Sequence, residues 1–246
     1  MIQLEKICKQ YTNHNHTVRA VDNVSFSVAP NERVGIAGGS GSGKSTLLRM
    51  IALLEKPTSG NLWLFGKDVT SIQNHTDLYR SMQMMFQNPL AVIPPRMDLE
   101  AFLLEPYINY GLMDIASAKD DIRKWMQRVD LPENTVNKYP HEVSGGQLQR
   151  VVLARIMLMN PKLVLFDEPT SALDAVNQKL VLDLLQKLHR EQPFGYVFVS
   201  HDIGLLQAVT DRIIVMKDGQ IVETIESKRL KEAVHPYTQA LVEASV

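Results

Sequence analysis

The chain has 246 residues, a formal net charge of −1 at neutral pH and 22% charged residues. This length allows one large domain or two small ones, and the balanced charge argues against nucleic acid as a partner. The single cysteine, Cys8, excludes an internal disulfide framework and a four-thiolate metal site, and it suits a reducing compartment.

Strand patterns dominate the first part of the chain, where short apolar alternations are separated by turn residues. Cys8 is expected to be a small, partly buried residue on the first strand. The predicted elements of this part are strands at residues 2–7, 21–28, 33–37 and 61–65, a turn at 30–32, and a helix at 46–54 that Pro57 ends.

Helical patterns dominate residues 88–160, most clearly at 118–129 and 147–159, so we predict a mainly helical insertion in a sheet protein. Buried-strand patterns return afterwards, as continuous apolar runs typical of strands covered on both faces. They occupy residues 163–166 and 196–199, and Asp218-Gly219 predicts a hairpin between strands at 212–216 and 220–223.

Two features bear on membranes. No run of about 18 apolar residues occurs, and residues 1–10 lack the apolar stretch of a secretory signal. We therefore expect any role at a membrane to depend on a partner protein.

The segment between the strand at 33–37 and the following helix fits the phosphate-loop pattern G-x-x-x-x-G-K-[ST]. Glycines let such a loop curl so that its N–H groups point at phosphate oxygens, and the helix start adds its positive dipole end. Lys44 is placed to bind the β- and γ-phosphates of ATP, and the Ser45 hydroxyl to bind Mg²⁺. The alternative, a flexible loop that matches by chance, does not explain the flanking strand and helix. The predicted ATP-binding residues of this segment are Gly38, Gly39, Ser40, Gly41, Ser42, Gly43, Lys44, Ser45 and Thr46.

Two carboxylates, Asp167 and Glu168, end the apolar run at 163–166. The strand carries Asp167 to the carboxyl edge of the sheet, where ligands of open α/β sheets bind. We expect Asp167 to hold Mg²⁺ and Glu168 to orient or deprotonate the attacking water. A solvated acidic pair in a turn is the alternative, and the phosphate loop makes it the weaker one.

Further motifs resemble those of ABC ATPases, in the order in which that family has them. The segment Val143-Ser144-Gly145-Gly146-Gln147 resembles the LSGGQ signature, and Ser171-Ala172-Leu173-Asp174 resembles the D-loop. His201 resembles the switch histidine, Gln87 the Q-loop glutamine, and Tyr11 the aromatic residue that stacks on adenine. The resemblance covers essentially the whole chain. It departs at Val143, in place of leucine, and at Leu148, where relatives commonly carry arginine.

The resemblance implies an α/β fold, namely a P-loop NTPase core of ABC ATPase type with an N-terminal antiparallel β subdomain and a helical insertion. It implies one domain over residues 1–246, with a helical subdomain at approximately 88–160. It also implies ATP hydrolysis in which Glu168 and His201 are catalytic, while Ser45, Gln87 and Asp167 bind Mg²⁺.

Ser144 offers a second candidate phosphate site. It is a good N-cap for the next helix, and Gly145 and Gly146 leave the first N–H groups of that helix uncovered. The family architecture implies that Ser144 of one subunit closes over the γ-phosphate held by Lys44 of another. An ordinary capped turn is the alternative reading of Ser144.

Several motifs resemble the peptide/nickel importer branch of the family. They are Phe86-Gln87-Asn88-Pro89, Pro94-Pro95-Arg96-Met97, Glu105-Pro106, Tyr139-Pro140-His141-Glu142 and His235-Pro236-Tyr237-Thr238-Gln239-Ala240-Leu241. Longer oligopeptide members often carry a cysteine-bearing extension that this sequence lacks. This favours nickel or metal-chelate import over peptide import.

The branch resemblance also implies partners. They are a second ABC ATPase, either a paralogue or a second copy, two transmembrane permease subunits that residues 88–104 help to contact, and an extracytoplasmic substrate-binding protein. The implied location is peripheral, at the cytoplasmic face of the cell membrane. The alternatives are an ABC ATPase of a non-transport system and a non-hydrolysing ATP-dependent regulatory module. The sequence lacks the coiled-coil insertions, tandem cassettes or basic patches of the first, and Glu168 and His201 argue against the second.

Overall fold

The computed structural model describes residues 1–13, 16–69, 72 and 75–245, and the chain forms two compact units. The sheet unit comprises Met1–Met84, Lys162–Glu168 and Phe194–Val246. The helical unit comprises Met85–Pro161 and Pro169–Pro193. Each unit therefore contains segments that are distant in sequence.

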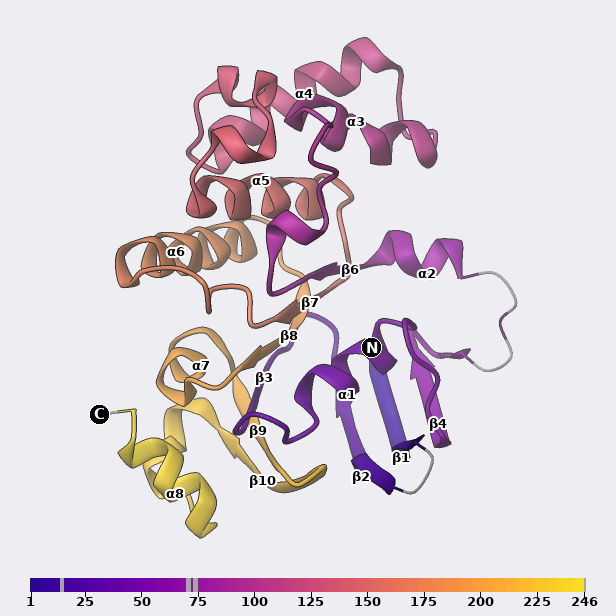
Figure 1. The fold of residues 1–246 in the computed structure, drawn as a ribbon, viewed down its shortest axis with the longest axis vertical. Helices are drawn as coiled ribbons and strands as arrows, with labels where there is room; N and C mark the ends of the chain where they lie inside the picture. The colour runs from indigo at the N-terminus through magenta and orange to yellow at the C-terminus, as the bar shows by residue number, and fades with distance from the viewer. Residues whose placement is uncertain (14–15, 70–71, 73–74, 246) are drawn as a thin grey trace. The chain divides into compact units, whose positions relative to one another are not determined.

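The sheet unit contains a four-stranded antiparallel sheet in the order β2-β1-β4-β5 (Figure 1). Alternation builds it, because apolar side chains such as Ile2 and Leu4 are buried while the intervening residues face outward. The predicted antiparallel subdomain is confirmed, and Cys8 is half-buried on its first strand, as expected. Its strands are β1 (Ile2–Asn13), β2 (His16–Val28), β4 (Ser59–Leu64) and β5 (Lys67–Asp68).

The second sheet has six strands in the order β10-β9-β3-β8-β7-β6, and its centre is parallel. The hairpin predicted at Asp218-Gly219 joins β9 and β10, and both turn residues have the positive φ that such a turn requires (49° and 81°). The strands are β3 (Arg33–Ala37), β6 (Met82–Met85), β7 (Leu163–Asp167), β8 (Gly195–Ser200), β9 (Arg212–Lys217) and β10 (Gln220–Glu226).

Two helices cover the faces of this sheet. Helix α1 (Lys44–Ile51) buries Leu47 and Leu48 in one core with side chains of both sheets. Helix α7 (Ile203–Val209) packs against β3, where a Cβ added to Gly35 would lie 3.3 Å from Leu206. Helix α1 ends earlier than the predicted residue 54, because the backbone turns left-handed at Leu53 (φ 60°).

Three further elements of the sheet unit lie in the part of the chain that the structure describes. They are α2 (Thr76–Ser81), the short 3₁₀ helix η5 (Ser227–Glu232) and α8 (Pro236–Glu243). Helix α8 packs against η5 and α7, and it is the last helix of the chain in Figure 1.

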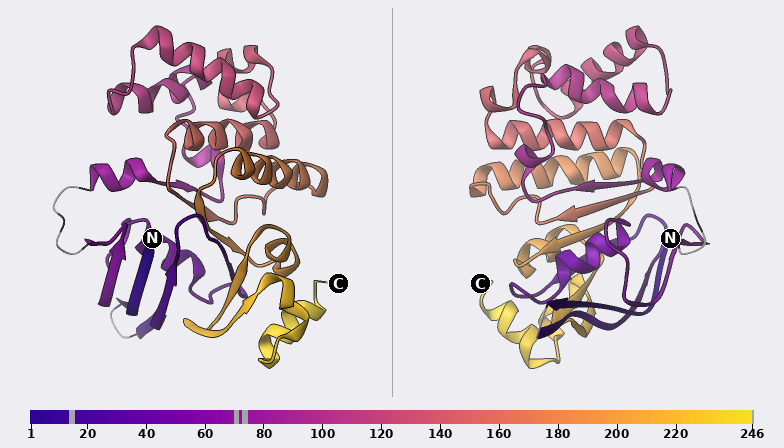
Figure 2. Two further views of the ribbon diagram at one scale, coloured as in Figure 1. Left: turned by 180° about the vertical axis from the view of Figure 1, so that it is seen from behind. Right: turned by 45° about the vertical axis from the view of Figure 1, so that its right-hand side comes forward.

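The helical unit is built from α3 (Leu99–Asn109), α4 (Ile115–Arg128), α5 (Gly145–Leu158) and α6 (Ala175–Glu191). Helix α3 packs on α4 and α5, and α5 packs on α6 (Figure 2). An aspartate or serine caps each amino end and accepts a backbone N–H. The short 3₁₀ helix η2 (Pro89–Ala91) precedes α3, and η3 (Glu133–Asn137) and η4 (Pro140–Glu142) lie between α4 and α5. Within the described residues, no helix combines the length and apolar character that a membrane span needs.

Candidate functional site

The glycine loop leaves the carboxyl end of β3 and enters α1 at Lys44. Gly43 precedes the helix with a φ of 98°, and a Cβ there would lie 2.1 Å from the Ala20 carbonyl oxygen, so only glycine fits. No side chain caps the start of α1. Its first N–H groups are therefore available to an anion, while Ser40 and Gly41 are exposed at the loop surface.

Lys44 is only 5% exposed, and its ammonium group is held inside the loop. Its Nζ donates to the carbonyl oxygens of Gly38 at 2.8 Å and of Gly39 at 2.9 Å. Burial lowers the pKa of Lys44, and the nearby carboxylates of Glu168 and Asp167 oppose that effect. The loop thus holds a buried cation in the position that a phosphate would neutralise.

Asp167 ends β7 beside α1 and is 7% exposed. The Ser45 hydroxyl donates to its Oδ1 at 2.8 Å, so the two predicted Mg²⁺ ligands of the sheet unit lie together. Burial raises the pKa of Asp167, against the opposing effects of the Ser45 hydrogen bond and the Arg49 charge. These oxygen donors match the preference of Mg²⁺ for hard ligands.

Glu168 follows in a strained conformation, with a φ of 45°. Its N–H donates to the Val199 carbonyl oxygen at 3.1 Å, which fixes the residue against β8. The Nδ1 atom of His201, just after β8, lies 3.2 Å from Glu168 Oε2. The fold therefore pairs the two predicted catalytic side chains at the carboxyl edge of neighbouring strands.

Tyr11 lies on β1 and is 41% exposed. Its hydroxyl donates to Glu55, and the Lys9 ammonium group lies 5.1 Å from the ring centroid. Burial and Glu55 raise the pKa of Tyr11, while a hydrogen bond with the Thr46 side chain lowers it. Tyr11 thus presents an aromatic surface next to the first turn of α1.

In the helical unit, a side-chain hydrogen bond links the predicted D-loop to the predicted Q-loop. The Gln87 side chain donates to the Ser171 hydroxyl at 3.3 Å. Asp174 caps α6 by accepting the N–H groups of Val176 and Asn177, both at 3.0 Å. The D-loop itself contains a turn. The Leu173 N–H donates to the Thr170 carbonyl oxygen at 3.1 Å and closes this turn around Ala172.

Ser144 begins α5 as predicted, in a reciprocal capping box. Its hydroxyl accepts the Gln147 N–H at 3.3 Å, and its own N–H donates to Gln147 Oε1 at 3.0 Å. A Cβ on Gly146 would lie 2.7 Å from Asn177 Oδ1, so the signature helix and α6 approach closely at this glycine. Leu148, the second predicted departure from the family pattern, is 1% exposed and packs in the core.

The predicted site residues thus form two sets. The sheet unit brings together Tyr11, the glycine loop, Asp167, Glu168 and His201, and the helical unit brings together Gln87, the signature and the D-loop. Sequence reasoning missed the support of the loop. The Gly219 N–H of the β9–β10 hairpin donates to the Ser42 carbonyl oxygen at 3.2 Å, and Tyr237 of α8 also contacts the loop.

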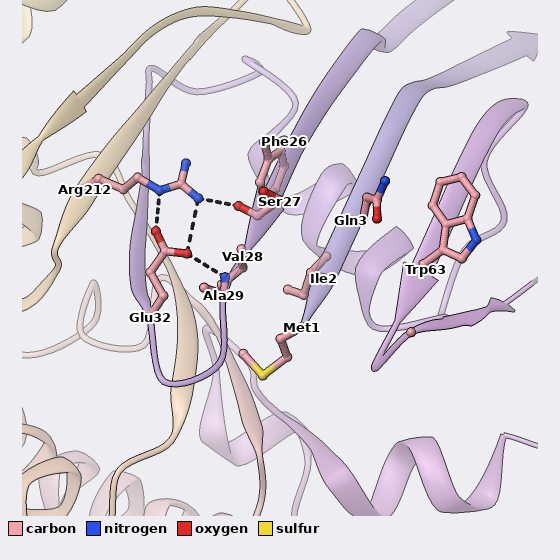
Figure 3. Close-up of a pocket in the computed structure, with 11 residues that line it drawn as sticks. Met1, Ile2, Gln3, Phe26, Ser27, Val28, Ala29, Glu32, Trp63 and Arg212 are labelled. Carbon is pink, nitrogen blue, oxygen red and sulfur yellow. Dashed lines mark hydrogen bonds and ion pairs between the residues drawn. The ribbon is translucent and has the colours of Figure 1, made fainter.

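A separate cavity of about 700 Å³ lies at the amino ends of β3 and β9, whereas the glycine loop follows the carboxyl end of β3 (Figure 3). Its two charged side chains are engaged with each other, because Arg212 Nε donates to Glu32 Oε1 at 2.5 Å. Glu32 Oε2 also accepts the Ala29 N–H at 2.7 Å. None of the predicted ATP-site residues lines this cavity.

A glycine loop between a buried strand and an uncapped helix, with an acidic strand end beside it, is typical of a P-loop nucleotide-binding protein. The comparisons with known proteins narrow this class. Residues 21–171 match the protein family described as "ABC transporter". The chain therefore belongs to the ABC transporter family, and it is an ATP-binding and ATP-hydrolysing member of it.

Two curated relatives and one solved structure illustrate the match. The "Oligopeptide transport ATP-binding protein AppF" of Bacillus subtilis is 38% identical over 229 residues, 92% of this chain and 70% of the relative. The "Oligopeptide transport ATP-binding protein OppF" of Salmonella typhimurium is 38% identical over 232 residues, 93% and 70% of the two chains. A dimeric ATP-binding cassette in a post-hydrolysis state, bound to ADP and Pi, superposes with a TM-score of 0.84 at 31% identity, covering 92% of this chain and 99% of that one. The predicted fold class and family resemblance are confirmed.

Proposed function

We propose that this chain is the ATP-hydrolysing subunit of an importer for peptides. One observation carries the proposal: the sheet unit gathers the groups that hold and hydrolyse a nucleotide, while the helical unit contains a second, separate capped helix start, at Ser144. The peptide relatives support peptides as the cargo. Nickel or a metal chelate, which the sequence favoured, becomes the competing cargo.

Nucleotide binding falls to the glycine loop. The N–H groups of the loop and of the first turn of α1 surround the phosphates, and Lys44 turns from the carbonyl oxygens of Gly38 and Gly39 to the β- and γ-phosphates. Tyr11 stacks on the adenine through its exposed ring. Because Lys44 is buried, its attraction to an incoming phosphate is little screened by water.

Mg²⁺ is the metal that the site fits. Ser45 and Asp167 supply adjacent oxygen donors, and Gln87 of the helical unit is the third proposed ligand. When bound, the ion neutralises negative charge on the phosphates. In its absence Asp167 bears a desolvation cost, which the raised pKa of its carboxyl group reflects.

Hydrolysis rests on Glu168 and His201. We assign Glu168 the task of orienting and deprotonating the attacking water, because its carboxylate lies at the strand end beyond Asp167. His201, 3.2 Å away, holds that carboxylate and responds to the γ-phosphate. The left-handed backbone conformation of Glu168 fixes the direction in which its side chain leaves the main chain.

The sites are proposed to be completed across a dimer. Ser144 and the N–H groups of Gly145 and Gly146 close over the γ-phosphate held by Lys44 of the partner cassette, and the D-loop at 171–174 contacts the partner. The dimeric form of the solved relative supports this arrangement. We propose that the partner is a paralogue or a second copy, and that residues 1–246 act as one domain with a helical subdomain at about 88–160.

We further propose that the dimer works at the cytoplasmic face of the cell membrane under two permease subunits, with a substrate-binding protein outside. The exposed Leu90 in the segment 88–104 is suited to contact a permease. Transport tests the cargo. In cells that lack this chain, uptake of labelled di- and oligopeptides should fall while nickel uptake persists. Loss of nickel uptake alone would establish the competing cargo, and no change in either would refute import.

Two substitutions test the chemistry. Glu168→Gln keeps the shape but removes the base, so hydrolysis should fall about 10²- to 10⁴-fold while ATP still binds. Lys44→Ala should weaken ATP binding, because it removes a charge-assisted contact. Glu133→Gln, an exposed change in the helical unit, is the control and should hydrolyse ATP normally. Parental hydrolysis by Glu168→Gln, or unchanged affinity of Lys44→Ala, would refute these assignments.

A further inference from the structure

Helix α8 reaches back to the glycine loop through one side chain. The Gly39 N–H donates to the Tyr237 hydroxyl at 2.8 Å, which links residues 198 positions apart. The Tyr237 ring is half-buried, and the Lys217 ammonium group lies 5.2 Å from its centroid. Packing and a cation–π contact therefore fix the ring independently of its hydroxyl.

The hydroxyl contacts the peptide group that also binds Lys44. The Gly39 N–H and the Gly38 carbonyl belong to one planar trans peptide, so they point in opposite directions. Tyr237 accepts from the N–H side, while Lys44 Nζ donates to the Gly38 carbonyl oxygen at 2.8 Å. The two side chains hold the same rigid plane from its two ends.

Different neighbours contact the two ends of this peptide, and Tyr237 is the one on the Gly39 side. Gly38 has a φ of 154°, and a Cβ there would lie 2.3 Å from the Met216 carbonyl oxygen, so the backbone is tightly packed on that side. A Cβ added to Gly39 would meet the Tyr237 hydroxyl oxygen at 3.1 Å, and within the described residues no other atom outside its chain neighbours lies within 4 Å of it.

The attachment of α8 does not depend on this hydroxyl. The Glu223 carboxylate on β10 accepts the N–H groups of Val234 at 2.8 Å and His235 at 3.2 Å. Thr238, on the first turn of α8, is fully buried. Removing the hydroxyl should therefore leave the helix in place.

We propose that Tyr237 is a positioning residue of the ATP site, which orients the Gly38–Gly39 peptide and thereby sets where Lys44 waits for the phosphates. The proposal rests on the proposed phosphate-binding role of the loop. It also assigns a structural role to the motif at 235–241, because α8 places the Tyr237 hydroxyl against the loop.

Tyr237→Phe removes the hydroxyl and keeps the ring. Titration calorimetry of the full chain with ATP should show a Kd about three- to tenfold higher than that of the parent, the range expected for one neutral hydrogen bond. Binding stoichiometry and the Tm without nucleotide should be unchanged. Tyr79→Phe, which removes an exposed tyrosine hydroxyl on α2, is the control and should bind like the parent. A parental Kd for Tyr237→Phe overturns the proposal. So does a lowered Tm or stoichiometry at an unchanged Kd, which is the mark of a merely structural residue.

Gly39→Ala is a second test of the contact, and it does not alter α8. Its Cβ presses on the Tyr237 hydroxyl, so it should raise the Kd in the parent but add less in the Tyr237→Phe background. Fully additive effects would contradict direct contact. Lys44→Ala distinguishes a failure of the phosphate-binding role of the loop from a failure of the positioning role of Tyr237. If it binds ATP like the parent, the phosphate-binding role is wrong, whereas loss of binding by Lys44→Ala with parental binding by Tyr237→Phe refutes the positioning role alone.

Discussion

Replacing Ser144 with alanine separates its structural role from its proposed catalytic one. The substitution removes the hydroxyl that accepts the Gln147 N–H at 3.3 Å. This bond is longer than the common 2.9–3.0 Å, which places the loss of the cap near the lower end of its range, about 0.5–1 kcal/mol. For a chain of this size the Tm should fall by about 1–4 °C. If Ser144 also donates to the partner's γ-phosphate, a charged hydrogen bond worth about 1.5–3 kcal/mol is lost as well, and ATP turnover should fall about 10- to 150-fold.

The assay compares phosphate release at saturating ATP with the Tm of the nucleotide-free chain. Asp114→Ala is the matched control, because Asp114 caps α4 by accepting the Ser117 N–H at 3.0 Å and has no proposed contact with ATP. Both variants should lose a few degrees of Tm, and only Ser144→Ala should lose turnover. Equal loss of turnover in both, or parental turnover in Ser144→Ala, would refute the role of Ser144 in hydrolysis.

Three further predictions concern the site, the sheet and the permease contact. Since burial raises the pKa of Asp167, its charge costs stability above that pKa. Asp167→Asn should therefore raise the Tm of the nucleotide-free chain at pH 7.5, and this gain should vanish toward pH ~4. A lower Tm of Asp167→Asn at pH 7.5 would contradict the expected direction of the stability change. Gly60→Ala combines a φ of 95° with a Cβ 2.4 Å from the Lys6 carbonyl oxygen and should cost about 2 kcal/mol or more. Gly66→Ala, at a φ of 78° with nothing within 4 Å, should cost less, and an equal loss in chemical denaturation would show that the clash is relieved. Leu90→Glu should abolish transport while the purified chain hydrolyses ATP normally, and normal transport would exclude residue 90 from the permease contact.

Local patterns predicted most elements of the sheet unit. Continuous apolar runs gave β7 and β8, and Asp218-Gly219 gave the hairpin of β9 and β10. Short, mixed segments were missed, such as β6 and α2, whose few apolar residues carry no clear period. Helix α3 lies inside the predicted helical insertion, but its bounds were not predicted, because Pro106 lies inside it and its apolar residues surround the axis rather than form one stripe.

The site was predictable to the extent that its chemistry is written in adjacent residues. The glycine loop, the acidic pair and the signature are each contiguous, and the pairing of Ser45 with Asp167 follows from parallel strands that end at one edge. The Tyr237 hydroxyl on Gly39 and the Gly219 contact with Ser42 were not predictable in this way. Both depend on how the last segments of the chain pack against the loop, which no local pattern encodes.

The central claim is that ATP closes two cassettes over each other, with a loop from one chain and a capped helix start from the other around each nucleotide. Sedimentation velocity of Glu168→Gln, with and without ATP, tests it most directly, because this variant should hold ATP without hydrolysing it. The account predicts a species of twice the mass in the presence of ATP, formed with itself or with a coexpressed cassette paralogue, and monomers without ATP. Monomers under both conditions, with either partner, would contradict the account.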